Sequence, residues 1–161
     1  MFDVKIPIYD AFDYPYVYIK FLNENARMPT RAKEGDAGLD LYAAEDVFIP
    51  VGVTALVSLG IATEIPLNTM LKIEDRSSMA IKGLRTGAGI VDSGYRGEIK
   101  VVMHNLTCVE DTDPVLFKKG KQIKKGDKIA QAILHPILLP IPNKTEELKD
   151  TSRGTGGFGI S

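Results

Sequence analysis

The chain has 161 residues, of which 44% are hydrophobic, and this is enough for one ordinary domain with its own core. Its formal net charge of -1 excludes a global field that would draw it to nucleic acid or to acidic lipid. The single cysteine, Cys108, excludes an internal disulfide. With no signal peptide in the first 20 residues and no apolar run long enough for a bilayer, we expect a cytoplasmic protein with no membrane or nucleic-acid partner.

Short runs of Val, Ile, Thr and Tyr, broken by Gly or Pro, predict many short strands. In chain order these strands are expected at 16–22, 39–49 (a strand and a turn into another), 54–65 (one or two strands), 69–76, 98–105 and 127–138. Only 77–83 looks helical, with two turns at most. This pattern predicts an all-β fold of the jelly-roll, sandwich or barrel kind with one short helix.

The segment "GIVDSGYRGEIK", residues 89–100, predicts a hairpin with one carboxylate, Asp92, beside a Ser-Gly turn. A positioned carboxylate can act as a general base. A turn aspartate that bonds to its own backbone is the structural alternative.

The end of the chain, "RGTGGFG" at 153–159, places one cation and one aromatic ring among glycines. Glycine backbone N–H groups can converge on an anion, an arginine can bind phosphate with two donors, and a phenylalanine can stack on a base. A disordered terminus is the alternative.

Five blocks carry a family resemblance when they are read together. They are "DAGLDLYAAED" (36–46), "DRSSMAIKGL" (75–84), "GAGIVDSGYRGEIKV" (87–101), "KKGDKIAQAIL" (124–134) and "RGTGGFG" (153–159). In this order they resemble the five motifs of the trimeric deoxyuridine triphosphatase (dUTPase) family. The resemblance implies a jelly-roll homotrimer in which the C-terminal arm is exchanged between subunits. It also implies hydrolysis of dUTP to dUMP and pyrophosphate with Mg²⁺, which keeps uracil out of DNA and supplies dUMP for dTMP synthesis.

The resemblance assigns roles along the hairpin. Asp92 is expected to activate the water that attacks the α-phosphate. Tyr95 is expected to pack under the deoxyribose and exclude a 2′-hydroxyl, although a cross-strand aromatic is also a structural element. Main-chain groups near Gly89, Ile90 and Lys100 are expected to bind uracil, with a ligand-free glycine bulge as the alternative.

The phosphates are expected to contact Arg76, Ser77 and Ser78, for which a serine N-cap is the alternative. Gln131 is expected either to reach a phosphate or to bond to backbone. Asp40 is expected either to hold a metal-bound water or to make a structural hydrogen bond. An acid at position 75, where the family usually has a small residue or proline, would repel phosphates unless it pairs with Arg76 or Lys72.

In the arm, Arg153 is expected at the γ-phosphate, and Phe158, flanked by Gly157 and Gly159, is expected over the uracil. Ile160 departs from the small polar residue that is usual there. We expect an N-terminal extension (1–20), a β-core (21–142) and a mobile arm (143–161). The polar segment 106–123 is expected to be either a solvated loop or a lineage-specific protein contact.

Two other functions were compared with this one. The dCTP deaminases share the fold, but they carry a glutamate where this chain has Val102 and tend to have tryptophan at position 95. A nucleotide-binding regulatory protein of the same fold is the second alternative, and the presence of Asp92, Tyr95, Arg153 and Phe158 together argues against a purely structural shell.

Overall fold

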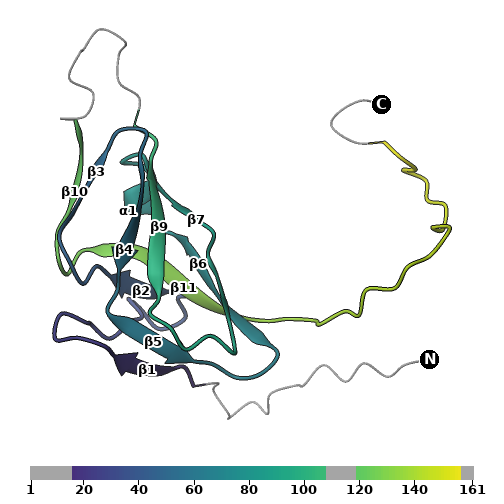
Figure 1. The fold of residues 1–161 in the computed structure, drawn as a ribbon, viewed down its shortest axis with the longest axis horizontal. Coiled ribbons are helices and arrows are strands. Elements are labelled where there is room, and N and C mark those ends of the chain that lie inside the picture. The colour runs from purple at the N-terminus through teal and green to yellow at the C-terminus, as the bar shows by residue number, and fades with distance from the viewer. Residues whose placement is uncertain (1–15, 108–118, 157–161) are drawn as a thin grey trace, which may run out of the picture.

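The computed structural model describes residues 16–107 and 119–156, and within these ranges nearly all regular structure is β (Figure 1). The strands are β1 Tyr18–Phe21, β2 Leu39–Tyr42, β3 Val47–Pro50, β4 Thr54–Ser58, β5 Ile61–Glu64, β6 Thr69–Asp75, β7 Leu84–Gly87, β8 Ile90–Asp92, β9 Lys100–Asn105, β10 Gly120–Ile123 and β11 Lys128–Pro136. One short helix, α1 Ser77–Ala80, follows β6. The predicted all-β fold with one short helix is confirmed.

The strands pair in four antiparallel sheets. The largest has the order β2-β11-β6-β8, and a second has the order β4-β9-β7. Two smaller sheets pair β1 with β5 and β3 with β10. Because β8 lies beside β6, and β6 runs directly into α1, the predicted hairpin and the predicted phosphate segment are attached to opposite ends of one strand.

The core lies between the sheets and follows the two-residue period of the strands. In β6, Leu71 and Ile73 are buried, while Lys72 and Glu74, which alternate with them, are partly exposed. In β9, Val101 and Met103 are buried in the same way. Burial of one side chain of this size stabilises the fold by about 1.5–3 kcal/mol. Because successive side chains point to opposite faces of a strand, the face that carries the apolar side chains becomes the internal one.

Most predicted elements agree with the structure, and some differ. As predicted, 39–49 contains two strands, and 54–65, predicted as one or two strands, also contains two; they are separated at residues 43–46 and at Leu59–Gly60. The helix is a single turn, because Gly83 adopts a positive φ of 81° and β7 begins at the next residue. Strand β10 lies inside 106–123, which had been predicted to be a solvated loop or a contact segment, and it is held by its pairing with β3.

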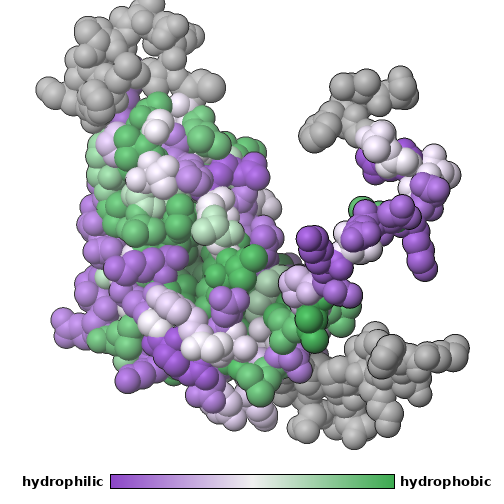
Figure 2. All heavy atoms as spheres, turned by 45° about the vertical axis from the view of Figure 1, so that its right-hand side comes forward, coloured by the Kyte–Doolittle hydropathy of each residue, from purple (hydrophilic) through white to green (hydrophobic). Residues whose placement is uncertain are grey.

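After β11 the chain leaves the core and runs outward as residues 137–156 (Figure 1). Figure 2 shows hydrophobic residues where this segment leaves the core and hydrophilic residues further out. Leu138, Leu139 and Ile141 are exposed along it. No helix in the described part of the chain is both long and apolar enough to span a membrane.

Candidate active site

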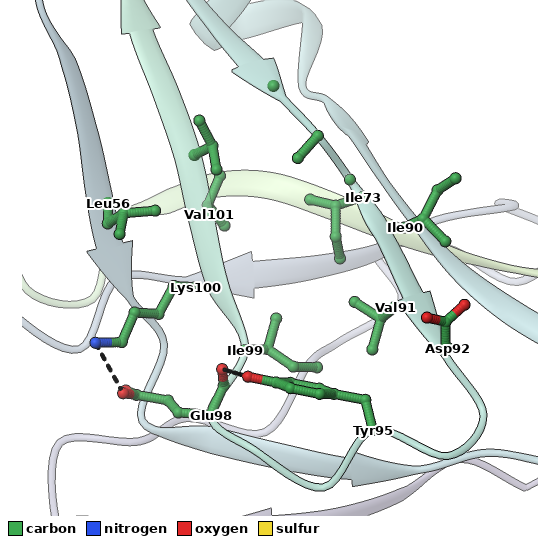
Figure 3. Close-up of a pocket in the computed structure, with 14 residues that line it drawn as sticks. Leu56, Ile73, Ile90, Val91, Asp92, Tyr95, Glu98, Ile99, Lys100 and Val101 are labelled. Carbon is green, nitrogen blue, oxygen red and sulfur yellow. Dashed lines mark hydrogen bonds and ion pairs between the residues drawn. The ribbon is translucent and has the colours of Figure 1, made fainter.

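The β-hairpin predicted at 89–100 is wrong, because β8 pairs with β6 whereas β9 pairs with β4 and β7, so the two strands belong to different sheets. Residues 89–100, for which the name hairpin is kept, form one wall of a cavity of about 450 Å³ (Figure 3). Strands β8 and β9, the loop between them and the residues before β8 supply most of the lining. The sequence-predicted residues that line it are Gly89, Ile90, Asp92, Tyr95 and Lys100. The structure therefore brings together every hairpin residue that the sequence singled out.

The turn before β8 depends on its backbone conformation. Ala88 and Gly89 both have positive φ, 56° and 94°. The Ile73 N–H donates to the Gly89 carbonyl at 2.7 Å, and a Cβ on Gly89 would lie 2.6 Å from the Ile73 carbonyl oxygen. Glycine is therefore required at position 89 because β6 approaches so closely, whether or not a ligand does.

Asp92 is the last residue of β8, is exposed, and pairs in register with Met70 at the start of β6. Its carbonyl accepts a hydrogen bond from the Tyr95 N–H at 3.0 Å, which closes the turn. In Figure 3 its carboxylate stands at the rim of the cavity. Among the described residues, no hydrogen bond or ion pair holds this carboxylate, so it does not cap its own turn and is available to a ligand.

Tyr95 lies in the turn after β8, with its ring along the cavity (Figure 3). Its hydroxyl donates to the Glu98 carbonyl at 3.0 Å. The Glu98 side chain also lines the cavity, and sequence reasoning missed it. Its partner, Ser58, lies 40 positions away, so no local pattern could indicate this contact.

The Glu98 carboxylate has a pKa below its ordinary value. The main cause is the hydrogen bond from the Ser58 hydroxyl, with smaller contributions from the Gly60 N–H and the Lys100 charge that together outweigh the opposing effect of burial. The cavity therefore contains an anion, Glu98, and a cation, Lys100, whose charged atoms are 3.4 Å apart.

The predicted phosphate residues lie elsewhere on the chain. Arg76 and Ser78 line a separate cleft of about 200 Å³, together with Lys82, Lys121 and Lys128. Ser77 and Ser78 are exposed at the start of α1, and Arg76 is the N-cap residue. A serine N-cap is therefore excluded, and the Ser78 hydroxyl instead accepts a hydrogen bond from Arg76 Nη1 at 3.3 Å.

Asp40 is buried between two cations. Its Oδ1 accepts from Arg76 Nε at 2.8 Å, and its Oδ2 lies 2.8 Å from Lys128 Nζ. The Asp40 carboxylate raises the pKa of Lys128. This arrangement favours the structural role of Asp40 over a metal role, because both oxygens already face positive charge.

Asp75 pairs with neither Arg76 nor Lys72, so both partners considered from sequence were wrong. Its carboxylate forms an ion pair with Arg85 and accepts hydrogen bonds from the Thr86 N–H and hydroxyl at 2.5 and 2.9 Å. Burial alone would raise the pKa of Asp75, but the Thr86 hydrogen bonds and the Arg85 charge lower it overall. Asp75 therefore connects the end of β6 to β7, and the charge of Arg85 balances its own.

Gln131 lies on β11 opposite Asp40, and its Nε2 donates to the Asp75 carbonyl at 2.8 Å. A Cβ on Gly38 would collide with the Gln131 side chain, so Gly38 leaves room for it. The sequence left open a phosphate contact or a bond to backbone, and the observed bond is to backbone. Gln131 thus contacts Asp75, the residue that precedes Arg76.

The arm residue Arg153 lies in the exposed segment, and its Nε donates to the Gly156 carbonyl at 2.9 Å. In the described part of the chain, Arg153 makes no hydrogen bond or ion pair with the hairpin or with Arg76, Ser77 and Ser78. Gly157, Phe158 and Gly159 lie outside the described residues, as do Ile160, Cys108 and the first 15 positions.

Ser77 and Ser78, called the serine cluster below, lie far from the hairpin cavity within one chain. Asp92 pairs with Met70, whereas Ser77 follows the other end of β6, so the strand rise of about 3.3 Å per residue separates them by roughly 20 Å. A general base must lie within hydrogen-bond reach of the attacking water. One chain therefore cannot bring Asp92 and Ser77 to the same phosphate.

The fold and the two clefts define an all-β protein with a cavity of the size of a small ligand, and comparison with known proteins gives the family. The dUTPase family model matches residues 24–161, so this chain belongs to the dUTPase family. The deoxyuridine 5'-triphosphate nucleotidohydrolase of Yarrowia lipolytica is 44% identical over 144 residues, which cover 88% of this chain and 85% of that protein. The protein of the same name from Paramecium bursaria Chlorella virus 1 is 42% identical over 142 residues, which cover 88% and 94%.

Solved structures agree with the fold. The dUTPase of Staphylococcus bacteriophage 80alpha, solved with dUpNHpp, has a TM-score of 0.77 at 28% identity and covers 91% of this chain and 98% of its own. A dUTPase mutant from phage phi11 of S. aureus, whose structure reveals the coordination of a structural Mg(II) ion, has a TM-score of 0.73 at 28% identity. It covers 84% of this chain and 99% of its own.

Proposed function

We propose that this chain is a dUTP diphosphatase that hydrolyses dUTP to dUMP and pyrophosphate. The observation that carries the proposal is the hairpin cavity, where Asp92, Tyr95 and the backbone of Gly89 and Ile90 line one space. The membership of the chain in the dUTPase family supports the same substrate. The cavity volume of about 450 Å³ suits a nucleoside.

In the proposed reaction, Asp92 accepts a proton from water. The water oxygen forms a bond to the α-phosphorus, the bond from that phosphorus to the α–β bridging oxygen breaks, and pyrophosphate leaves with the bonding electrons. Positioning and charge stabilisation provide most of the catalysis in such transfers. The exposed carboxylate of Asp92 suits the role of base, because no group in the described part of the chain forms a hydrogen bond or ion pair with it.

The hairpin would bind the nucleoside. Main-chain groups at Gly89, Ile90 and Lys100 would bind the uracil edge, and the Tyr95 ring would lie under the sugar. Backbone N–H and C=O groups at these positions can serve as donors and acceptors for one pyrimidine edge. Arg76, Ser77, Ser78 and Gln131 would bind the phosphates.

Because Asp92 and Ser77 are separated by roughly 20 Å in one chain, we propose that each site is built from different subunits of a homotrimer. The exposed segment 137–156 leads the arm away from its own core (Figure 1), which supports its exchange. Arg153 would then reach a phosphate on another subunit, with Gly157, Phe158 and Gly159 closing over the base and excluding water.

Magnesium is proposed as the metal. The described residues contain no group of three or more His, Cys, Asp or Glu side chains that could hold a metal ion. Mg²⁺ commonly takes substrate phosphate oxygens and water as ligands, so a site without a protein cage fits it. When bound, the ion supplies positive charge to the triphosphate oxygens.

Deamination of dCTP is disfavoured by the cavity itself. Val102 lines it at the position where the deaminases carry a glutamate. An apolar side chain there cannot assist the attack of water on a pyrimidine ring.

The test is to incubate the purified protein and Mg²⁺ with dUTP, dCTP, dTTP or UTP and to measure pyrophosphate and ammonia. Pyrophosphate from dUTP, in large excess over the other three, is the expected result. Ammonia from dCTP would support a deaminase instead. No product with any nucleotide would support a binding protein of the same fold.

A further inference from the structure

The position of the Tyr95 ring is set by Gly97 and Glu98, and Glu98 is in turn held by residues outside the hairpin. Residues 93–99 contain no strand, and the backbone hydrogen bonds that join this loop to the neighbouring strand residues are made at its end, by Ile99. The ring lies across Gly97, where a Cβ would be 2.5 Å from the Tyr95 hydroxyl oxygen. The Tyr95 hydroxyl donates to the Glu98 carbonyl, so the position of the ring in the cavity depends on the position of the Glu98 backbone (Figure 3).

The Glu98 side chain fixes that backbone to the turn between β4 and β5. Its Oε1 accepts a hydrogen bond from the Ser58 hydroxyl and a second from the Gly60 N–H at 3.1 Å. Its Oε2 lies 3.4 Å from Lys100 Nζ. One carboxylate thus connects three parts of the chain, and hydrogen bonds to an ionised acceptor are stronger than neutral ones.

The neighbouring backbone supports the same attachment. The Ile99 N–H donates to the Ile61 carbonyl at 2.8 Å, and the Leu59 N–H donates to the Ile99 carbonyl at 3.4 Å. These bonds hold the far side of Glu98. On the other side of Glu98, Arg96 donates to the carbonyls of Ser93 and Tyr95 within the turn, and its one described contact outside the turn is a 3.9 Å ion pair with Glu64.

We infer that Glu98 is a positioning residue that determines sugar selectivity by holding the Tyr95 ring at a fixed height under the sugar. This rests on the proposed function, in which the ring excludes a 2′-hydroxyl. A ring excludes a 2′-hydroxyl only while it stays in contact with the sugar. If the Tyr95 ring can move away from the sugar by the width of an atom, the hydroxyl fits and the exclusion is lost. Loss of the Glu98 anchor therefore admits the ribonucleotide more than it harms the deoxyribonucleotide.

The experiment measures kcat/KM for dUTP and for UTP in the wild type and in Glu98→Ala, and reports their ratio. We expect the ratio to fall about tenfold or more in Glu98→Ala, mainly through a lower KM for UTP. Glu98→Gln keeps an oxygen that can accept from Ser58 and Gly60, so its ratio should stay within about threefold of the wild type. Ser58→Ala removes one anchor bond from the opposite side and should lower the ratio in the same direction.

Glu64→Gln is the matched control, since Glu64 lies on β5 and its one side-chain interaction among the described residues is the 3.9 Å ion pair with Arg96 in the same loop. Its ratio should not change. A crystal structure of Glu98→Ala should show the Tyr95 ring displaced, and Ser58→Ala provides the same test if Glu98→Ala does not fold.

An unchanged ratio in Glu98→Ala and Ser58→Ala, with the wild type active on dUTP, would overturn this inference alone. A Glu98→Gln ratio as low as that of Glu98→Ala would also overturn it, because the hydrogen bonds would not be what holds the ring. A wild type that releases no pyrophosphate from dUTP would instead remove the proposed function on which the inference rests.

Discussion

Asp92 has an exposed carboxylate at the rim of the hairpin cavity, and no described group holds it. Asp92→Asn keeps the size of the side chain and its turn, but it removes the basic oxygen. We expect kcat for dUTP to fall by about 10²- to 10⁴-fold, with binding of a non-hydrolysable dUTP analogue nearly unchanged. Steady-state kinetics and calorimetric titration measure the two quantities. Wild-type turnover in this variant would remove Asp92 as the base.

Asp75 provides a prediction about pH. Its pKa is lowered in the folded protein, so its contribution to stability is fully present above the ordinary value of 3.8. This contribution is lost as the pH falls through the lower, folded pKa. Asp75→Asn cannot pair with Arg85, and above pH 4 it should be less stable than the wild type by about 1 kcal/mol. Below that range the difference should shrink.

Urea unfolding at several pH values measures this difference. Glu74→Gln is the control, since Glu74 is the preceding residue of β6 and its ion pair with Lys72, at 3.6 Å, lies on an exposed surface. A difference between Asp75→Asn and the wild type that does not depend on pH would show that the charge of Asp75 contributes nothing.

At the scale of the element, the turn before β8 is held by one glycine. Gly89→Ala must adopt a φ of 94° and place its Cβ 2.6 Å from the Ile73 carbonyl oxygen. We expect a loss of about 2 kcal/mol in the free energy of unfolding, together with a raised KM for dUTP. Gly94→Ala is the matched control in the same hairpin, because a Cβ there meets open space.

Thermal unfolding and steady-state kinetics on the two variants decide the matter. If Gly94→Ala destabilised the protein as much as Gly89→Ala, the close approach of β6 would not be the reason for glycine at position 89.

What the sequence could predict at this scale was local. The alternation in β6 and β9 indicated strands because burial of one face follows a two-residue period. The Ser-Gly pair after Asp92 correctly indicated a turn through its residue types, but it did not indicate that β8 and β9 belong to different sheets. Strand β10 was not recognised because "GKQI" has little apolar pattern, and its strand conformation comes from pairing with β3, about 70 residues earlier in the chain.

The candidate site shows the same division. The hairpin residues were found because they lie within twelve consecutive positions. The Asp75–Arg85 pair and the Glu98–Ser58 bond were not found, because the first joins two different strands and the second joins a loop to the strand β4, 40 positions away. Contacts of this kind depend on the register of the sheets, which a single sequence does not state.

At the scale of the whole molecule, the parts of the proposed site lie in three places on the chain. The hairpin lies beside one end of β6, the serine cluster follows the other end, and the arm leaves the core altogether (Figure 1). A closed cyclic oligomer can bring such parts together at each interface. A complete site then forms only in the oligomer. A subunit that lacks one part, such as the base, can therefore be complemented by a subunit that lacks another part, such as the arm.

Complementation gives the last prediction. Asp92→Asn and a chain that ends at Thr151 should each form a folded oligomer with little dUTP hydrolysis. When equal amounts are unfolded together and refolded, a site that takes Asp92 and the arm from different subunits has both intact in about one quarter of cases. Activity should therefore return to about one quarter of the wild-type value per site. Each variant refolded alone is the control, and if the mixture were as inactive as its components, Asp92 and the arm would have to act within one chain.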